Sequence, residues 1–401
     1  MIKILFVIIF ALLMISACED GESINDPQKI YLEDYGEIVR DTLTAINSTF
    51  IEHGKVNTGT STKLLLGSHD GFKCRFLVKF NPLSGENVIL DSMFLRLTTA
   101  SNYGEANNEF GGKIYLITEE WNSAVNLDEN WIYEDNISIL AETSTQFTCL
   151  TEDSSIYNIL LPDTLLSIWN DTTGGGNNFG LLVDFENADF IKEFSSGNSS
   201  NGPQLVFKFH EVEDDSIRSD TVDVSIDASL ISFDGNLQSD SLIYVLAGYA
   251  YYSFVEFNLD SIPRDIIISN TNFIFTNDSL GSNINNNFSK NFYIRTVETP
   301  YNNLPVYSAD STFLFNSFYN ISMTETNNLV EVNQTLQGYA GQFFTQSILK
   351  GDIGYGSFLI HHVGEGTTVS KYAIKGANDN IIEANRPKMI IEYFKIPKSR
   401  I

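Results

Sequence analysis

Aromatic side chains are the residues of this chain best suited to bind a ligand. The sequence contains three tryptophans, Trp121, Trp131 and Trp169. A flat aromatic ring can stack on the apolar face of a pyranose, and it can equally fill a protein core. We favour core packing for Trp121 and Trp169. Trp131 lies in a polar stretch together with Tyr133, so these two residues are the better candidates for binding a sugar.

A second aromatic group lies in the C-terminal half, at Tyr249, Tyr251 and Tyr252. The residues after Tyr251 alternate in polarity, which is typical of a strand with one buried face. We expect Tyr251 to face inward, which leaves Tyr249 and Tyr252 as surface candidates for ligand binding.

Acidic side chains are candidates for holding a cation. Asp184, Glu186 and Asp189 lie close together in the sequence, although not at the spacing of a recognised calcium loop. Calcium binds several oxygen ligands, so these three residues are the candidate ligands of a structural calcium ion. The adjacent His361 and His362 would point to opposite faces of a strand, so we expect both to be structural.

Two of the three cysteines, Cys74 and Cys149, could form a disulfide in an oxidising envelope. The alternative is that both are buried free thiols, which behave as small hydrophobic side chains. Spacing does not decide between the two readings, because a disulfide depends on geometry.

No catalytic motif is visible in the sequence. It contains no Gly-x-Ser-x-Gly elbow, no His-Glu-x-x-His, no phosphate loop and no dinucleotide fingerprint. A carboxylate pair for glycoside hydrolysis stays open, because its members can come from distant strands. We expect a protein that is not an enzyme.

Length and charge narrow the classes of protein. The chain has 401 residues, with 24 Lys and Arg against 51 Asp and Glu, a formal net charge of -27. Binding to nucleic acid through phosphates needs clustered cations, so this class is excluded. A hydrophobic content of 43% is sufficient for ordinary packed cores.

The N-terminal residues predict where the protein is located in the cell. Lys3 precedes an apolar run over residues 4–15, which is typical of a secretory signal and short for a membrane span. The run ends in Ile-Ser-Ala-Cys18, which resembles the bacterial lipobox, where the cysteine is lipidated. The alternative is an ordinary signal peptide with a chance cysteine. We therefore expect a signal peptide at 1–17 and a membrane attachment through lipid on Cys18 alone.

The acidic segment after Cys18 resembles the export tag of surface lipoproteins of Bacteroidetes-type bacteria. This resemblance implies an outer-membrane lipoprotein that faces the cell exterior, with residues 18–28 as the lipidated cysteine and its tether. The alternative is a solvated acidic linker.

The elements that would position these residues are predicted to be strands, and the same series of strands occurs twice along the chain. Residues 72–80 and 251–257 alternate with period two, and each segment is followed by further alternating strands at 93–97 and 271–275. The two copies are separated by roughly 180 residues, the size of a whole domain. Short helices are expected within 162–170 and 337–350. Because helices between strands are otherwise missing, the pattern predicts an all-β fold of two β-sandwiches.

The segments named next occur in a fixed order: residues 67–80, 93–97, 117–122, 167–170, 178–182 and 203–209, then 248–257 and 387–393. In this order they resemble the DNRLRE-type domain, a jelly-roll module of bacterial surface and secreted proteins. The resemblance implies two tandem jelly-roll domains, at 29–212 and 213–401. Residues 194–197 lack the Arg-Glu pair usual before the closing strand of that family.

Some members of the family are carbohydrate-binding modules. The resemblance therefore implies a non-catalytic lipoprotein that binds an extracellular polysaccharide or glycan. The alternative is a structural or adhesive envelope protein that docks onto a protein partner.

Overall fold

A computed structural model gives the fold of the chain. It describes residues 38–52, 56–81, 88–104, 109–121, 137–138, 145–150, 156–170, 178–212, 214–237, 241–249, 251–264, 266–285, 291–296, 319–326, 329–332, 356–362, 366–378 and 380–395. The signal and tether, Cys18 and the second candidate helix at 337–350 lie outside these residues.

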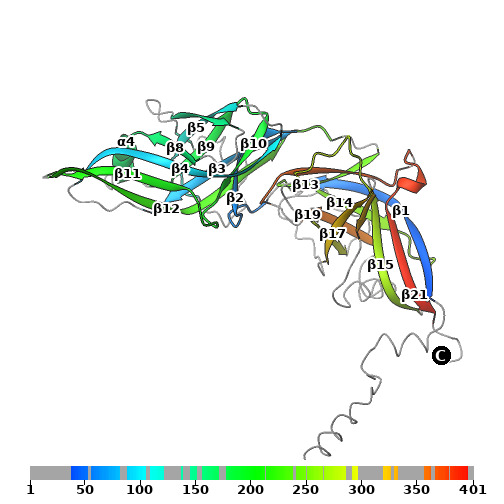
Figure 1. Cartoon of the computed structure of the whole chain (residues 1–401). Helices are drawn as coiled ribbons and strands as arrows, with labels where there is room; N and C mark the ends of the chain where they lie inside the picture. The colour runs from blue at the N-terminus through cyan, green and yellow to red at the C-terminus, as the bar shows by residue number, and fades with distance from the viewer. Residues whose placement is uncertain are drawn as a thin grey trace, which may run out of the picture.

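The described residues form an all-β structure, as the sequence predicts. Two antiparallel sheets, of eleven and ten strands, each fold into two layers around a core of their own, and we call them lobe 1 and lobe 2 (Figure 1). The division into two tandem jelly-roll domains and the cleaved signal stay predictions.

Lobe 1 contains β2 (Lys63–His69), β3 (Phe72–Phe80), β4 (Val88–Gly104), β5 (Glu109–Ile117), β6 (Ile137–Ser138), β7 (Gln146–Leu150), β8 (Ile156–Leu161), α4 (Thr164–Asn170), β9 (Leu181–Glu186), β10 (Phe190–Ser195), β11 (Gln204–Glu211) and β12 (Asp214–Phe233). Lobe 2 contains β1 (Ile38–Glu52), β13 (Leu242–Ala247), β14 (Tyr251–Phe257), β15 (Ile266–Thr276), β16 (Asn291–Thr296), β17 (Tyr319–Thr326), β18 (Leu329–Val332), β19 (Ser357–His362), β20 (Ser370–Lys375), η2 (Glu383–Asn385) and β21 (Lys388–Lys395).

Alternation along the strands builds the core of lobe 1. Met93, Leu95 and Leu97 on β4 are buried in the same cluster as Phe76 and Val78 on β3. Because side chains of a strand alternate between faces, the residues between them on β4 point away from the core. The helix expected within 162–170 is confirmed as α4, which covers this core with two buried residues, Leu165 and Trp169.

Long strands connect the two layers of each lobe. In lobe 1, the first part of β4 pairs with β8 and β11, while its last residues pair with β10 in the other layer. The strand β12 pairs with β11 over its first half and with β3 over its second half. In lobe 2, β1 does the same with β21 and then β14. Each lobe is therefore closed by a strand that belongs to both of its layers.

The closing strands are exchanged between the two lobes. β1 precedes all the strands of lobe 1 in the chain, yet it pairs with β21 and β14 of lobe 2. β12 comes directly before β13 of lobe 2 in the chain, as β1 comes before β2 of lobe 1, yet it pairs with β11 and β3 of lobe 1. In Figure 1, β1 in blue lies beside β21 in red, and β12 lies in the other lobe beside β11.

The two closing strands occupy corresponding positions in the two lobes, and we call each position the seat of its strand. The amide of Ala45 on β1 donates to the carbonyl of Pro387 at 2.8 Å, and that of Val224 on β12 donates to the carbonyl of Pro203 at 2.9 Å. Directly after these residues each strand has a bulge, at 45/47 and at 224/226. Opposite the bulges lie Phe257 and Phe80. The shared register shows that both seats accept a strand in the same way.

The domain division at 212/213 stays a prediction. The exchanged pairing departs from an arrangement in which residues 29–212 and 213–401 each supply all the strands of one sandwich. The mostly polar residues 214–219, which directly follow the predicted division, are the first residues of β12.

Candidate functional site

The outer face of one layer of lobe 1 carries a regular array of side chains. The layer consists of β8, β4, β11 and β12 in that order, and the side chains between its buried positions point away from the core. In this strand order the outward rows are Asn158, Arg96, Gln204 and Asp223; then Leu160, Phe94, Val206 and Thr221; then Ser92, Lys208 and Ser219. We call this array the outer face.

The middle row of the outer face is apolar. Leu160 is 57% exposed, the Phe94 ring is half-buried, and Val206 beside it is buried. These three residues lie on three strands spaced about 4.8 Å apart, so the apolar part of the row is about 10 Å long, and Thr221 ends it. The ammonium of Lys208 lies 5.8 Å from the centre of the Phe94 ring, a distance at which a cation and an aromatic ring attract.

Polar groups border the apolar row on both sides. Arg96 Nε donates to Asn158 Oδ1 at 3.0 Å, and Gln204 Nε2 donates to Asp223 Oδ1 at 2.8 Å. Guanidinium and amide groups have further donors and acceptors beyond these bonds. The arrangement offers an apolar strip for a ring face and hydrogen-bonding groups for the hydroxyls along its rim.

The sequence indicates half of this array. The alternation of Met93, Leu95 and Leu97 already places Phe94 and Arg96 on the outward side of one strand. Which strands lie beside β4 could not be predicted, because β8 was not expected as a strand and β12 comes from the other half of the chain.

The aromatic candidates do not form a single site among the described residues. Trp131 and Tyr133 lie outside them. Tyr249 is half-buried, and its ring stacks on Tyr251 at 5.7 Å. The expectation that Tyr252 is a surface residue is wrong: it is 7% exposed, with its ring 5.1 Å from that of His361. On this strand Tyr252 lies on the face away from the main core, where Phe254 and Leu359 also pack, so that face is covered rather than exposed.

The tryptophans expected in the core are found there. Trp169 on α4 belongs to the main core of lobe 1. Trp121 packs against Leu77 and Leu182 on the other side of the sheet, and its Nε1 donates to the carbonyl of Phe179 at 2.7 Å.

The three candidate calcium ligands are not gathered around one position. Asp184 accepts from Arg75 Nε at 2.5 Å, and Glu186 forms an ion pair with Lys113. The backbone carbonyl of Asp189 bonds His69 Nδ1. Within the part of the chain that the structure describes, no group of three acidic, histidine or cysteine residues is arranged to hold a metal ion.

The cysteines Cys74 and Cys149 are both free and buried, and they lie in different apolar clusters. The candidate disulfide is therefore absent from the structure. Burial raises the pKa of the Cys149 thiol to about 12, although the charge of Lys192 acts in the opposite direction. Burial also raises the pKa of Cys74 well above its usual range, and the charge of Glu193 adds to this. Both thiols stay protonated at neutral pH.

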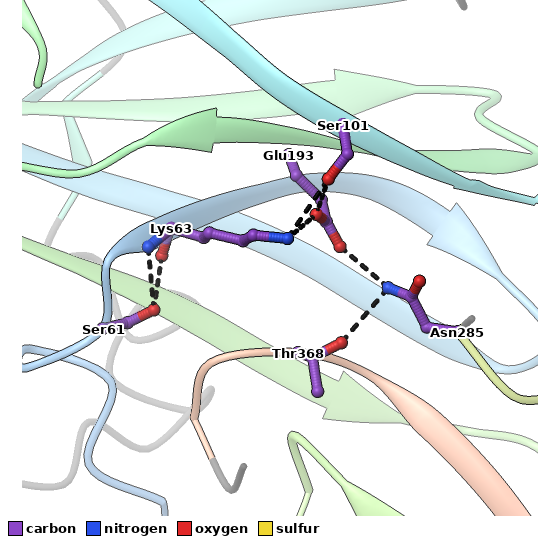
Figure 2. A network of polar contacts seen from close by, with 6 residues as sticks. All are labelled: Ser61, Lys63, Ser101, Glu193, Asn285 and Thr368. Carbon is purple, nitrogen blue, oxygen red and sulfur yellow. Dashed lines mark hydrogen bonds and ion pairs between the residues drawn. The ribbon is translucent and has the colours of Figure 1, made fainter. Parts of the chain in front are cut away.

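The junction between the lobes contains a buried polar network (Figure 2). Glu193 on β10 is 0% exposed and accepts from Lys63 and Ser101 of lobe 1. From lobe 2, Asn285 Nδ2 donates to Glu193 Oε1 at 2.8 Å and approaches Thr368 Oγ1 at 3.2 Å. A buried carboxylate needs such partners, so this network fixes the lobes relative to each other.

A second contact across the junction involves His69. Its Nδ1 lies 2.9 Å from the carbonyl of Asp189, and its Nε2 lies 3.0 Å from the side-chain amide nitrogen of Asn283. Both bonds are satisfied by the neutral tautomer with the proton on Nδ1. Tyr103 also donates to the carbonyl of Asn283, at 2.9 Å. Apolar residues complete the junction, with Leu65, Phe72 and Ile191 of lobe 1 in one cluster with Leu246 and Val369 of lobe 2.

Another buried carboxylate lies on the exchanged strand β12. Asp227 is 5% exposed, and its Oδ2 accepts from the amide of Gly197 at 2.5 Å. Burial raises the pKa of Asp227 from its ordinary value of 3.8 to about 6, although the bond from Gly197 lowers it. The charged form of Asp227 therefore carries an energetic cost in the folded protein.

Comparisons with known proteins identify no family for the chain. No family model and no curated protein matches it. A chain in the solved structure of the Macrobrachium rosenbergii nodavirus aligns over 89% of both chains, at 9% identity and a TM-score of 0.14. This likeness is too weak to support any argument. In the described residues no helix is long and apolar enough to cross a membrane.

Replacing Lys63 with methionine should destabilise the junction. The change leaves the buried Glu193 without its cation, and breaking such a pair costs about 3 kcal/mol. Chemical denaturation of the Lys63→Met variant should show this loss. The matched control is Lys73→Met, whose ion pair with Asp234 is exposed and should contribute much less. Adding Glu193→Gln to Lys63→Met should restore part of the stability; equal losses for Lys63→Met and Lys73→Met would contradict the assignment.

The buried carboxylate of Asp227 should make stability depend on pH. The folded protein binds this proton more tightly than the unfolded chain, so the free energy of unfolding should fall as the pH rises from about 4 to about 6. Asp227→Asn should remove this fall and gain up to about 3 kcal/mol at pH 7.5. Denaturation curves at pH 4 and 7.5 measure the effect, with Asp220→Asn, on the exposed part of β12, as the control. A gain of the same size at both pH values would contradict the prediction.

Proposed function

We propose that the chain is a non-catalytic lipoprotein of the bacterial cell surface that binds an extracellular polysaccharide or glycan through the outer face of lobe 1. The observation that carries the proposal is the apolar row of Leu160, Phe94 and Val206 between two rows of hydrogen-bonding side chains. Sugars present the same alternation, with apolar ring faces and hydroxyl groups at the rim.

The rigidity of the layer supports the proposal. Phe94, Arg96 and Val206 each stand between two buried neighbours of the core, so their backbone is fixed by the sheet. A preformed surface loses less conformational entropy when it binds a ligand. The resemblance of the chain to DNRLRE-type modules points to the same class of ligand.

The proposed location of the protein at the cell surface is inferred from its first residues. The lipobox-like sequence before Cys18 and the acidic segment after it support an anchor in the outer membrane with the body of the protein outside the cell. Attachment through lipid requires no membrane-spanning segment.

An adhesive role is the second candidate function. It is favoured by the exposed aliphatic side chains of β8, because Ile156 and Leu160 are 58% and 57% exposed on the same face of that strand. Exposed apolar side chains that lie together mark sites of protein contact. In this reading the outer face docks onto another envelope protein.

Substitution of polar residues on the outer face should separate these functions. Residues 19–401 are tested for retention on a panel of immobilised plant, algal and bacterial polysaccharides. The double variant Arg96→Ala, Gln204→Ala should weaken binding to the retained polymer at least about tenfold, because each lost hydrogen bond to a charged or amide group costs about 1–2 kcal/mol.

The matched control is Arg264→Ala, which removes an exposed arginine from lobe 2. Retention that is unaffected by the outer-face variant but lost in Trp131→Ala would move the site away from this face. No retention of the parent chain on any polymer would overturn glycan binding in favour of the adhesive role.

A further inference from the structure

Within the described residues, the chain continues from β1 to the rest of the structure only at the C-terminal end of this strand. All its ladder partners among the described residues belong to lobe 2, and it continues toward β2 of lobe 1 only through residues 53–62. The exchanged strand β12 is different, because it follows β11 and precedes β13 directly in the chain. β1 can therefore leave its seat without threading any other part of the described chain.

The seat of β1 is a groove with two unpaired edges when the strand is absent. One edge is β21, which pairs with residues 38–44, and the other is β14, which pairs with residues 45–52. Specific contacts select the occupant: Tyr393 donates to Asp41 at 2.7 Å, Asn47 donates to Glu256 at 2.6 Å, and the side chain of Ala45 enters the core.

We propose that this groove also accepts β1 of a second copy of the chain, so that two copies form a dimer by exchanging their first strands. The fold already shows that a closing strand can be supplied from outside its own segment, since β1 and β12 occupy corresponding seats with the same register. Exchange between two copies repeats this step with a partner of identical sequence. Because each copy gives and receives one strand, the dimer is closed and symmetric.

Exchange conserves the contacts of β1. In the dimer every ladder and side-chain bond of β1 and the buried Ala45 are kept. Thr58 and Thr62 stay bonded to lobe 1 of their own copy, at the carbonyl of Ser229 and the amide of Ser196, so only the connection between β1 and Thr58 takes a new path. The equilibrium then depends on the effective concentration of β1 at its own groove, which is in the millimolar range for a short connection. The dimer fraction should rise in proportion to chain concentration below this range. Once formed, the dimer should persist, because its dissociation requires both ladders to break.

A mixture of single-cysteine variants, in which the native Cys74 and Cys149 are replaced by alanine, tests the proposal. Arg40 and Glu392 lie opposite each other on β1 and β21, with Arg40 Nε 3.8 Å from Glu392 Oε1 and both side chains accessible. Chains of residues 19–401 carrying Arg40→Cys are mixed with chains carrying Glu392→Cys, unfolded, refolded together and oxidised. A disulfide between these two chains forms in register only when β1 has crossed from one copy to the other. Cross-linked dimer, measured on non-reducing gels, should rise about tenfold between 10 and 100 µM.

The control mixture combines Arg40→Cys with Lys208→Cys, an exposed position on β11 that β1 does not pair with in this fold. This mixture reports random collisions. Equal yields of dimer from the two mixtures would overturn the proposal, as would a yield that does not depend on concentration. The unmodified chain gives an independent readout: after refolding at 100 µM it should contain dimer by analytical ultracentrifugation, and monomer alone would also overturn the proposal.

Discussion

The seating of β1 between β21 and β14 is the constraint on which the rest of the structure depends. This strand closes lobe 2, and in doing so it ties the start of the chain to its end. In lobe 1 the corresponding place is taken by β12, which directly follows β11 in the chain and pairs with β11 and β3. The strands of lobe 1 follow one another from β2 to β12, whereas lobe 2 is incomplete without β1, which precedes lobe 1 in the chain. We infer that lobe 2 completes its fold only together with the segment that precedes lobe 1.

The exchange also accounts for the burial of a polar network in the junction, beside the apolar cluster of Leu65, Phe72 and Leu246. Two crossing strands hold the lobes together, so the surfaces between them are buried whatever their composition. Glu193 is enclosed there and is paired by Lys63, Ser101 and Asn285, because an isolated buried charge would be costly. The layer that carries the outer face is completed by β12, so the proposed binding surface also depends on the exchange. The closure of lobe 1 and the proposed binding surface therefore both depend on the position of β12.

Local patterns in the sequence predict the strands and most of the core, but not how the strands pair. The alternation of residues 72–80 and 251–257 gives β3 and β14, and the spacing of Leu165 and Trp169 gives α4. β12 was missed because its first residues are polar and exposed, which resembles a linker. The exchange could not be predicted, because the two closing strands fit corresponding seats and local sequence does not distinguish them. Tyr252 was misplaced for a related reason: both faces of β14 are covered, so alternation does not mark a solvent-exposed side.

Disulfide trapping within one chain tests the exchanged topology most directly. By the correspondence of Ala45 with Val224 and of Pro387 with Pro203, Arg40 occupies the place of Ser219, and Glu392 that of Lys208. Two double variants are compared at high dilution, Arg40→Cys with Glu392→Cys and Arg40→Cys with Lys208→Cys, and the cross-links are mapped by mass spectrometry of peptides. The exchanged fold predicts an intramolecular disulfide in the first variant and none in the second. A disulfide in the second variant and none in the first would show that β1 closes lobe 1 and would contradict the account.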